Sequence, residues 1–200
     1  MTDSFLTIEK PVEGLFKDKG SKFISFAYPV ETEEEIKELV QQIKKEHYSA
    51  RHHCYAWRLG ADLKRFRAND DGEPSSTAGK PILGQIKRME LTNILIVVVR
   101  YFGGTLLGVS GLINAYKEAA VDVLSNSTIV EKLVEVEFKV EFEYPDMNPV
   151  MKIFKDENLI QKENQFDLRC NIKTSVRQMD ADRVIGKFEA IEGVHVVRVN

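Results

Sequence analysis

The stretch from Asn93 to Asn126 combines three patterns in a row and limits the folds that the chain can adopt. It begins with the apolar run Ile94–Val99, which has no polar face and is typical of a strand covered on both sides. A loop with four glycines follows: Gly103, Gly104, Gly108 and Gly111. From Val109 onward, apolar residues recur every three or four positions, as on one face of a helix. The stretch therefore predicts a buried strand, a glycine loop and a helix.

The glycine loop has two interpretations. It lacks the spacing of a Walker A motif and of a dinucleotide-binding fingerprint. Its glycines either permit tight turns and close packing of helix on sheet, or leave backbone N–H groups free to bind an anion. Arg100 stands at the end of the buried strand, where α/β folds place ligand contacts. It could equally form an ion pair with Asp70 or Asp71.

Charge and composition limit the classes of function. The formal net charge is −3, so any contact with nucleic acid would depend on a local patch. Cys54 and Cys170 form no C-x-x-C motif, which favours reduced thiols. The first residues have neither a basic nor an apolar segment of a leader peptide, and no apolar run approaches the ~20 residues that span a bilayer. We therefore expect a cytoplasmic protein without membrane contact.

The part of the chain before the glycine loop alternates strand and helix patterns. Residues 12–30 predict two strands around a turn at 18–21. Thr32 and the glutamates after it have capping-box spacing, and the apolar pattern then predicts a helix to about residue 47. Residues 52–59 and 64–69 predict a hairpin. A loop rich in turn-forming residues follows at positions 70–79, and Pro81 suits the first turn of a short helix.

The pattern changes after Asn126, which predicts a second domain. Apolar and charged residues alternate from Val134 to Phe142, as in a half-buried strand. Asn148 before Pro149 suits a helix cap, and a strand near 159–165 leads to a second alternating run. A further helix, capped by Asp180, and a final strand at 194–199 complete the order β-α-β-β-α-β. We expect a protein of α+β class, with an N-terminal α/β domain at residues 1–127 and a C-terminal domain at residues 131–200.

Two clusters could bind metal in principle. His52-His53-Cys54 cannot converge on one ion, because neighbouring strand residues point to opposite faces. The 70–79 loop adds three acidic side chains: Asp70, Asp71 and Glu73. Acidic residues beside a glycine are common turn formers, and one short loop rarely supplies the ~6 ligands of a hard divalent cation. We expect no bound metal, no cofactor and no catalytic residue, since the chain shows no nucleophile with a base at convincing spacing.

Basic and aromatic side chains interleave on the predicted hairpin: Trp57, Arg58, Arg65, Phe66 and Arg67. Such a composition suits RNA or single-stranded nucleic acid, through stacking of bases and contacts with phosphates. A solvated sheet edge with the tryptophan in the core explains the same residues without a ligand.

Three long motifs resemble the IMPACT/YigZ family. They are HHCYAW at 52–57, DDGEPSSTAGKPIL at 70–83 and VVVRYFGGTLLGVSGLINAYKEAA at 97–120. The resemblance implies an N-terminal domain of the superfamily that includes a small-subunit ribosomal protein domain, domain IV of elongation factor G and GHMP kinases. It also implies a ferredoxin-like C-terminal domain similar to domain V of elongation factor G, in agreement with the order of elements found above.

The resemblance also implies a role in translation. Eukaryotic relatives control translation by competing for a large activator of the kinase that phosphorylates an initiation factor. For bacterial relatives, binding to nucleic acid or the ribosome is suggested by fold. The motif positions that carry over are His53, Asp70, Asp71, Glu73, Arg100, Tyr101, Gly103, Gly104 and Gly108. Four positions depart from the usual pattern: Ser76 and Ser110 replace glycine, Leu106 replaces lysine and Asn114 replaces arginine.

These observations predict a translation-associated regulatory or binding protein that contacts RNA, the ribosome or a translation-factor partner. A metal-dependent hydrolase of phosphorylated or nucleotide substrates and a protein-interaction module without nucleic acid are the alternatives. We expect the 70–79 and 100–111 loops to meet at one end of the sheet and to form one concave surface, because both carry glycines and polar groups before helices.

Overall fold

The computed structural model describes residues 3–167 and 169–199. The chain divides into two compact units between Lys132 and Leu133, and each unit has a sheet and a hydrophobic core of its own. Within the described ranges, no helix is long and apolar enough to cross a membrane.

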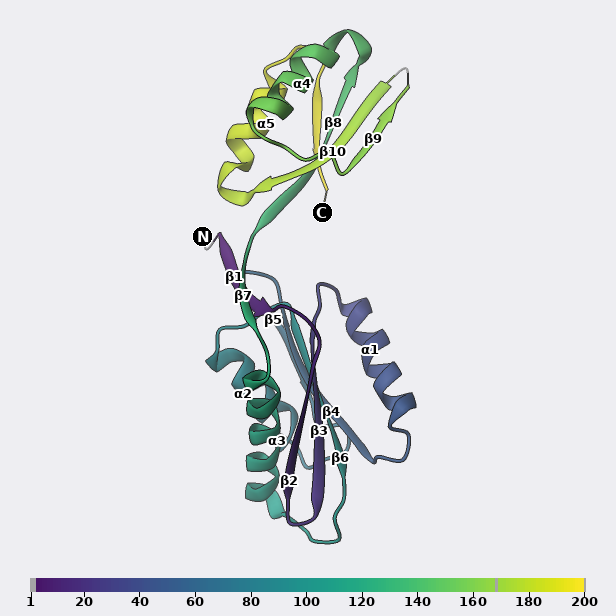
Figure 1. The fold of residues 1–200 in the computed structure, drawn as a ribbon, viewed down its shortest axis with the longest axis vertical. Coiled ribbons are helices and arrows are strands. Elements are labelled where there is room, and N and C mark those ends of the chain that lie inside the picture. The colour runs from purple at the N-terminus through teal and green to yellow at the C-terminus, as the bar shows by residue number, and fades with distance from the viewer. Residues whose placement is uncertain (1–2, 168, 200) are drawn as a thin grey trace. The chain divides into compact units, whose positions relative to one another are not determined.

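The N-terminal unit is built on a five-stranded sheet (Figure 1) in which all neighbouring strands are antiparallel. In spatial order the strands are β2 (Val12–Asp18), β3 (Ser21–Pro29), β6 (Ile94–Tyr101), β4 (His52–Leu59) and β5 (Arg65–Asn69). The predicted turn between the first two strands is confirmed, with Lys19 and Gly20 at φ of 44° and 82°. The predicted hairpin of β4 and β5 is confirmed as well.

Helices cover both faces of this sheet. Helix α1 (Glu33–Glu46) lies on one face, and α2 (Gly79–Arg88) and α3 (Gly108–Ser125) lie on the other (Figure 1). The predicted capping box of α1 is present: the Glu35 N–H donates to the Thr32 hydroxyl, and the Thr32 N–H donates to the Glu35 carboxylate.

The central strand β6 shows why its sequence has no polar face. Leu95, Val97 and Val99 pack in the core beneath α1, whereas the alternating residues pack beneath α2 and α3. All six residues from Ile94 to Val99 are fully buried. The buried strand predicted at this position is therefore confirmed, together with the helix that follows the glycine loop.

The sequence pattern did not reveal a two-stranded sheet formed by β1 (Ser4–Ile8) and β7 (Ile129–Leu133). Most of the residues in β7 are exposed, so this strand lacks the alternation that marks a half-buried strand.

The C-terminal unit has the predicted β-α-β-β-α-β order and is ferredoxin-like. Its elements are β8 (Glu135–Glu143), α4 (Met147–Asp156), β9 (Glu163–Phe166), β10 (Arg169–Arg177), α5 (Ala181–Glu189) and β11 (His195–Arg198). The strands form an antiparallel sheet in the order β11-β8-β10-β9. Short 3₁₀ turns, Tyr144–Asp146 and Gln178–Asp180, lead into the two helices.

Local details of this unit differ from the sequence prediction. The 3₁₀ turn places Asp146 at the N-cap of α4, so Asn148 lies inside the helix and does not cap it. Asp180 stands at the N-cap of α5 as predicted, but its side chain makes no capping hydrogen bond. The strand β9 begins at Glu163, later than expected from the apolar residue Leu159, which packs against the core instead.

Candidate functional site

The 70–79 loop joins β5 to α2 at one end of the N-terminal sheet, and its first acidic residue organises the start of the helix. The Asp70 carboxylate accepts hydrogen bonds from the backbone N–H groups of Ala78 at 3.0 Å and Gly79 at 2.8 Å, and also from Ser76 at 2.8 Å. Helix α2 has no cap from its own N-cap side chain, so Asp70 satisfies these donors from a distance in sequence. Asp70 thus holds the loop in its shape.

The second acidic residue, Asp71, binds to the α1 side of the sheet. Its carboxylate accepts hydrogen bonds from Lys44 Nζ at 2.8 Å and from the His53 backbone N–H at 2.7 Å. Burial alone would raise the pKa of Asp71, but the hydrogen bonds from Lys44 and His53 outweigh it and lower the pKa below its usual value. Its φ of 39° is left-handed, a conformation that aspartate tolerates. Asp71 therefore connects the loop to helix α1 and strand β4.

The third acidic residue, Glu73, points to the opposite face and is almost fully buried. Its Oε1 accepts hydrogen bonds from Arg100 NH1 at 2.7 Å and from the Tyr116 hydroxyl at 2.8 Å. The side chains of Glu73 and Arg100 are only 4% and 8% exposed. Cys54 Sγ lies 3.3 Å from the Tyr116 hydroxyl, and burial raises the pKa of both Tyr116 and Cys54. Four residues from four different segments thus form one buried polar network.

This network corrects one expectation and reveals two residues that sequence reasoning missed, Tyr116 and Cys54. Arg100 pairs with Glu73, whereas the sequence suggests Asp70 or Asp71 as its partner. The sequence pattern places Tyr116 on the apolar face of the helix. A buried tyrosine on such a face needs a hydrogen-bond partner for its hydroxyl. This requirement is the sequence signal that could have identified Tyr116 as part of a polar network.

The two loops meet through the pair of Glu73 and Arg100, but they do not form a single surface. His52 pairs in register with Arg100, and His53 with Val99. Because successive strand residues point to opposite faces, His53 and Asp71 lie on the α1 side, whereas Arg100 lies on the α3 side. The expectation of one concave surface containing both Asp71 and Arg100 was therefore wrong. The structure has a cavity on each side.

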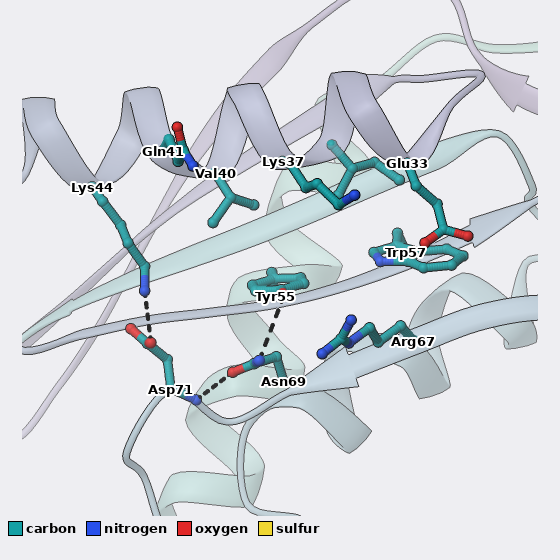
Figure 2. A pocket seen from close by; sticks show the side chains of 11 residues that line it. Glu33, Lys37, Val40, Gln41, Lys44, Tyr55, Trp57, Arg67, Asn69 and Asp71 are labelled. Carbon is teal, nitrogen blue, oxygen red and sulfur yellow. Dashed lines mark hydrogen bonds and ion pairs between the residues drawn. The ribbon is translucent and has the colours of Figure 1, made fainter.

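The first of these, the helix cavity, lies between α1 and the hairpin (Figure 2) and has a volume of about 230 Å³. Lys44 extends from the helix to Asp71, and the rings of Tyr55 and Trp57 lie on the strand side. His53 is buried and does not line this cavity; its Nε2 lies 3.1 Å from the carbonyl oxygen of His47, so it is a packed structural histidine. Acidic and basic groups are mixed in this cavity.

The hairpin does not present its five predicted nucleic-acid contacts on one surface. Trp57 is only 6% exposed and packs in the core beneath α1, so a base cannot stack on it in this fold. Arg65 and Arg67 lie on the α1 side, where Arg65 forms an ion pair with Glu33 at 2.9 Å. Arg58 and Phe66 are paired residues on the other side. There the Arg58 Nε–H donates to the Leu63 carbonyl oxygen, and Lys87 Nζ lies 3.6 Å from the Phe66 ring centroid.

The second cavity, which we call the arginine cavity, lies beside the glycine loop and has a volume of about 300 Å³. The residues that line it are Arg51, His52, Arg100, Phe102 and Leu106. His52 Nδ1 lies 2.9 Å from the carbonyl oxygen of Asp71. Since a carbonyl oxygen can only accept, Nδ1 carries a proton and the ring orientation is fixed. No carboxylate lines this cavity among the residues that the structure describes.

The glycine loop beside this cavity combines close packing with exposed apolar groups. A Cβ atom at position 103 would overlap the backbone of Gly20. Only glycine at position 103 therefore allows the two turns to pack. Gly104 and Gly108 have φ of 87° and 71°. Phe102 is 56% exposed and Leu106 is 84% exposed. Tyr101 belongs to the scaffold, since its hydroxyl oxygen lies 2.8 Å from His47 Nδ1.

Residues 19–124 match the family model of the Impact N-terminal domain. The IMPACT family member YvyE of Bacillus subtilis is 32% identical over 182 residues, which cover 91% of this chain and 84% of YvyE. The chain belongs to the IMPACT family. YigZ of Escherichia coli, another IMPACT family member, is 37% identical over 150 residues, or 74% of each chain. A crystal structure of a hypothetical protein has a TM-score of 0.78 at 28% identity, and the match covers 100% of this chain and 99% of that one.

The region that matches the IMPACT domain contains the whole candidate site. It includes the 70–79 loop, the glycine loop and the described residues that line the two cavities. In residues 3–167 and 169–199, no group of three or more histidine, cysteine, aspartate or glutamate side chains is placed to hold a metal ion. The site of this IMPACT chain is thus a polar scaffold around one loop, with a cavity on each face of the sheet.

Proposed function

We propose that this IMPACT family protein is a translation-associated regulatory protein that binds RNA, free or within the ribosome. We assign the contact to one end of the N-terminal domain, the glycine-loop end, which we define as Tyr48, Arg51, His52, Arg100, Phe102 and Leu106. The resemblance to eukaryotic relatives that control translation supports a role in translation. The chemistry of the glycine-loop end supports RNA as the ligand.

The observation that carries the proposal is the arginine cavity with exposed aromatic side chains at the same end. Arg51 is exposed and lines the cavity, and Phe102 stands beside it with more than half of its surface in solvent. Tyr48 is also exposed and directly follows His47, which is hydrogen-bonded to Tyr101. Arginine for phosphates and aromatic rings for bases is the combination that binds single-stranded RNA.

The acidic loop supports binding rather than hydrolysis. A metal-dependent hydrolase needs carboxylates that are free to bind a cation or to activate water. Here Asp70 accepts hydrogen bonds from three backbone N–H groups, and Asp71 accepts hydrogen bonds from Lys44 and from one backbone N–H. Glu73 accepts hydrogen bonds within the buried network. The three carboxylates are hydrogen-bonded to the protein itself, as expected of a scaffold.

One observation favours a second candidate, a module that binds protein without nucleic acid. Leu106, Val109 and Ile113 are exposed apolar residues on the glycine loop and the first turns of α3. The resemblance to the family implies lysine at position 106, so leucine there leaves this end with one positive charge fewer and more apolar surface. Exposed apolar groups next to one another are typical of surfaces that bind protein.

Direct binding measurements distinguish these candidates. We expect the full chain to bind a single-stranded RNA weakly, with an affinity that falls as salt rises, because phosphate binding releases counterions. Arg51→Ala should weaken binding and reduce the salt slope by about 0.7 for each phosphate that the protein no longer neutralises. The matched comparison is the Arg65→Ala/Arg67→Ala variant of the hairpin. Equal weakening in both variants would extend the RNA-binding surface to the hairpin, and no binding by the unmodified chain would leave the protein-binding module.

A further inference from the structure

The arginine cavity contains a buried donor that the fold itself does not satisfy. Arg100 donates from NH1 to Glu73, but its Nε–H is buried and has no hydrogen-bond partner among the described residues. Most buried polar groups in proteins are paired, so an unpaired one on a residue that lines a cavity indicates a site for a ligand or an ordered water. The Nε–H belongs to a charged group, which makes an anion the ligand of choice.

The surroundings of Arg100 hold its guanidinium in one place. Glu73 fixes NH1, and the guanidinium carbon lies 5.7 Å from the Phe23 ring centroid and 5.8 Å from that of Phe102. Tyr116 in turn holds Glu73. An arginine positioned in this way loses little conformational entropy when a ligand binds, which favours affinity.

The other lining groups make the cavity positive overall. The charge of Arg100 is balanced by Glu73, but Arg51 has no ion pair within residues 3–167 and 169–199, and no carboxylate from these residues lines the wall. His52 adds a ring that is held by Asp71. Asp71 itself turns its carboxylate to Lys44 on the other face, so it does not repel an anion here. The cavity therefore has the charge and the donors to bind one anionic group.

We propose that the arginine cavity binds a phosphate group, with the guanidinium groups of Arg100 and Arg51 as donors. Its volume of about 300 Å³ is at the small end of ligand pockets, enough for a phosphate and part of its organic substituent. The exposed ring of Phe102 lies at the same cavity, where a base or sugar attached to the phosphate can pack against it. The phosphate belongs either to a free mononucleotide or to the 5′ end of an RNA. Only the second source rests on the proposed function.

Titration of the full chain with defined phosphates tests this site. The probes are inorganic phosphate, uridine 5′-monophosphate, and one short RNA with a 5′-phosphate or a 5′-hydroxyl, followed by ³¹P NMR and calorimetry. Arg51→Ala removes an exposed side chain and should leave the fold intact. Arg88→Ala, an exposed arginine at the end of α2, is the matched control. Arg100→Gln is a second variant, used only if its tryptophan fluorescence matches that of the unmodified chain.

We expect uridine 5′-monophosphate to bind, and Arg51→Ala to weaken it about tenfold, the usual effect of removing a hydrogen bond to a charged group. Arg88→Ala should have no effect. Equal binding of the two RNAs without any binding of inorganic phosphate or the mononucleotide would overturn the phosphate site but keep the RNA proposal. Mononucleotide binding without RNA binding would keep the site and reject the proposed function. If Arg51→Ala and Arg88→Ala weakened phosphate binding equally, the loss would come from the net charge of the protein rather than from a specific site, and the proposed site would be overturned.

Discussion

Replacement of Glu73 by alanine should destabilise the N-terminal unit more than any single change on its surface. Glu73 accepts hydrogen bonds from Arg100 and Tyr116, and both partners are buried. Without the carboxylate, Arg100 would remain as a buried charge with no counterion. The destabilisation comes mainly from this unpaired charge, since a buried ion pair as a whole often adds little to stability.

The loss of stability expected for Glu73→Ala is that of a buried ion pair from which one partner has been removed. Breaking a buried pair by removing one partner costs about 3–5 kcal/mol of the free energy of unfolding. For a unit of this size, such a decrease corresponds to a fall in melting temperature of roughly 10–20 °C. Tyr116→Phe removes the hydrogen bonds of its hydroxyl with Glu73 and Cys54 but leaves the ion pair, so it should cost only about 1–2 kcal/mol. Replacing both Glu73 and Arg100 by methionine should cost less than Glu73→Ala alone.

Urea unfolding monitored by tryptophan fluorescence measures these values. Trp57 is the single tryptophan of the chain and is buried in the N-terminal unit, so its signal reports that unit without interference from the other. A chain of two units need not unfold in one step, which makes a local probe necessary. If Glu73→Ala lay within about 1 kcal/mol of the unmodified protein, the buried network would have no role as the anchor of the loop.

Three further experiments test the roles of the acidic residues in the 70–79 loop. Asp70→Ala should lower the free energy of unfolding by about 2 kcal/mol, because the start of α2 loses its acceptor; an unchanged urea midpoint would contradict this. Asp71→Asn should destabilise by about 1 kcal/mol at pH 7. Since the folded pKa of Asp71 is lowered, its contribution is present above about pH 4 and is lost as pH falls further, so the two proteins should converge in acid. EDTA should leave the melting temperature unchanged; one equivalent of metal per chain, lost in Asp71→Asn, would instead favour a hydrolase.

The sequence predicted the features of the fold that depend on local patterns. The run Ile94–Val99 indicated a central strand because no residue in it could face water, and Thr32 with Glu35 marked the start of α1. The alternation from Val134 onward indicated the half-buried strand β8. Each of these signals is contained in a few neighbouring residues, so it survives without knowledge of tertiary contacts.

The directions of side chains in the site could not be read in this way. The three acidic residues of the 70–79 loop look alike in sequence, but left-handed backbone at Asp71 turns its carboxylate to one face while that of Glu73 lies on the other. Trp57 was a candidate for stacking because its neighbours are basic, yet the alternation of β4 directs it into the core. Such outcomes depend on strand register, which only the assembled sheet defines.

Crosslinking in living cells would show whether the glycine-loop end binds RNA. Material bound to the unmodified chain would be sorted into RNA, ribosomes and protein, and compared with that bound to an Arg51→Ala/Phe102→Ala variant and to the hairpin variant Arg65→Ala/Arg67→Ala. We predict that RNA or ribosomes are recovered with the unmodified chain and are reduced specifically in Arg51→Ala/Phe102→Ala. Recovery of protein alone, or an equal yield of RNA from all three chains, would contradict the proposal.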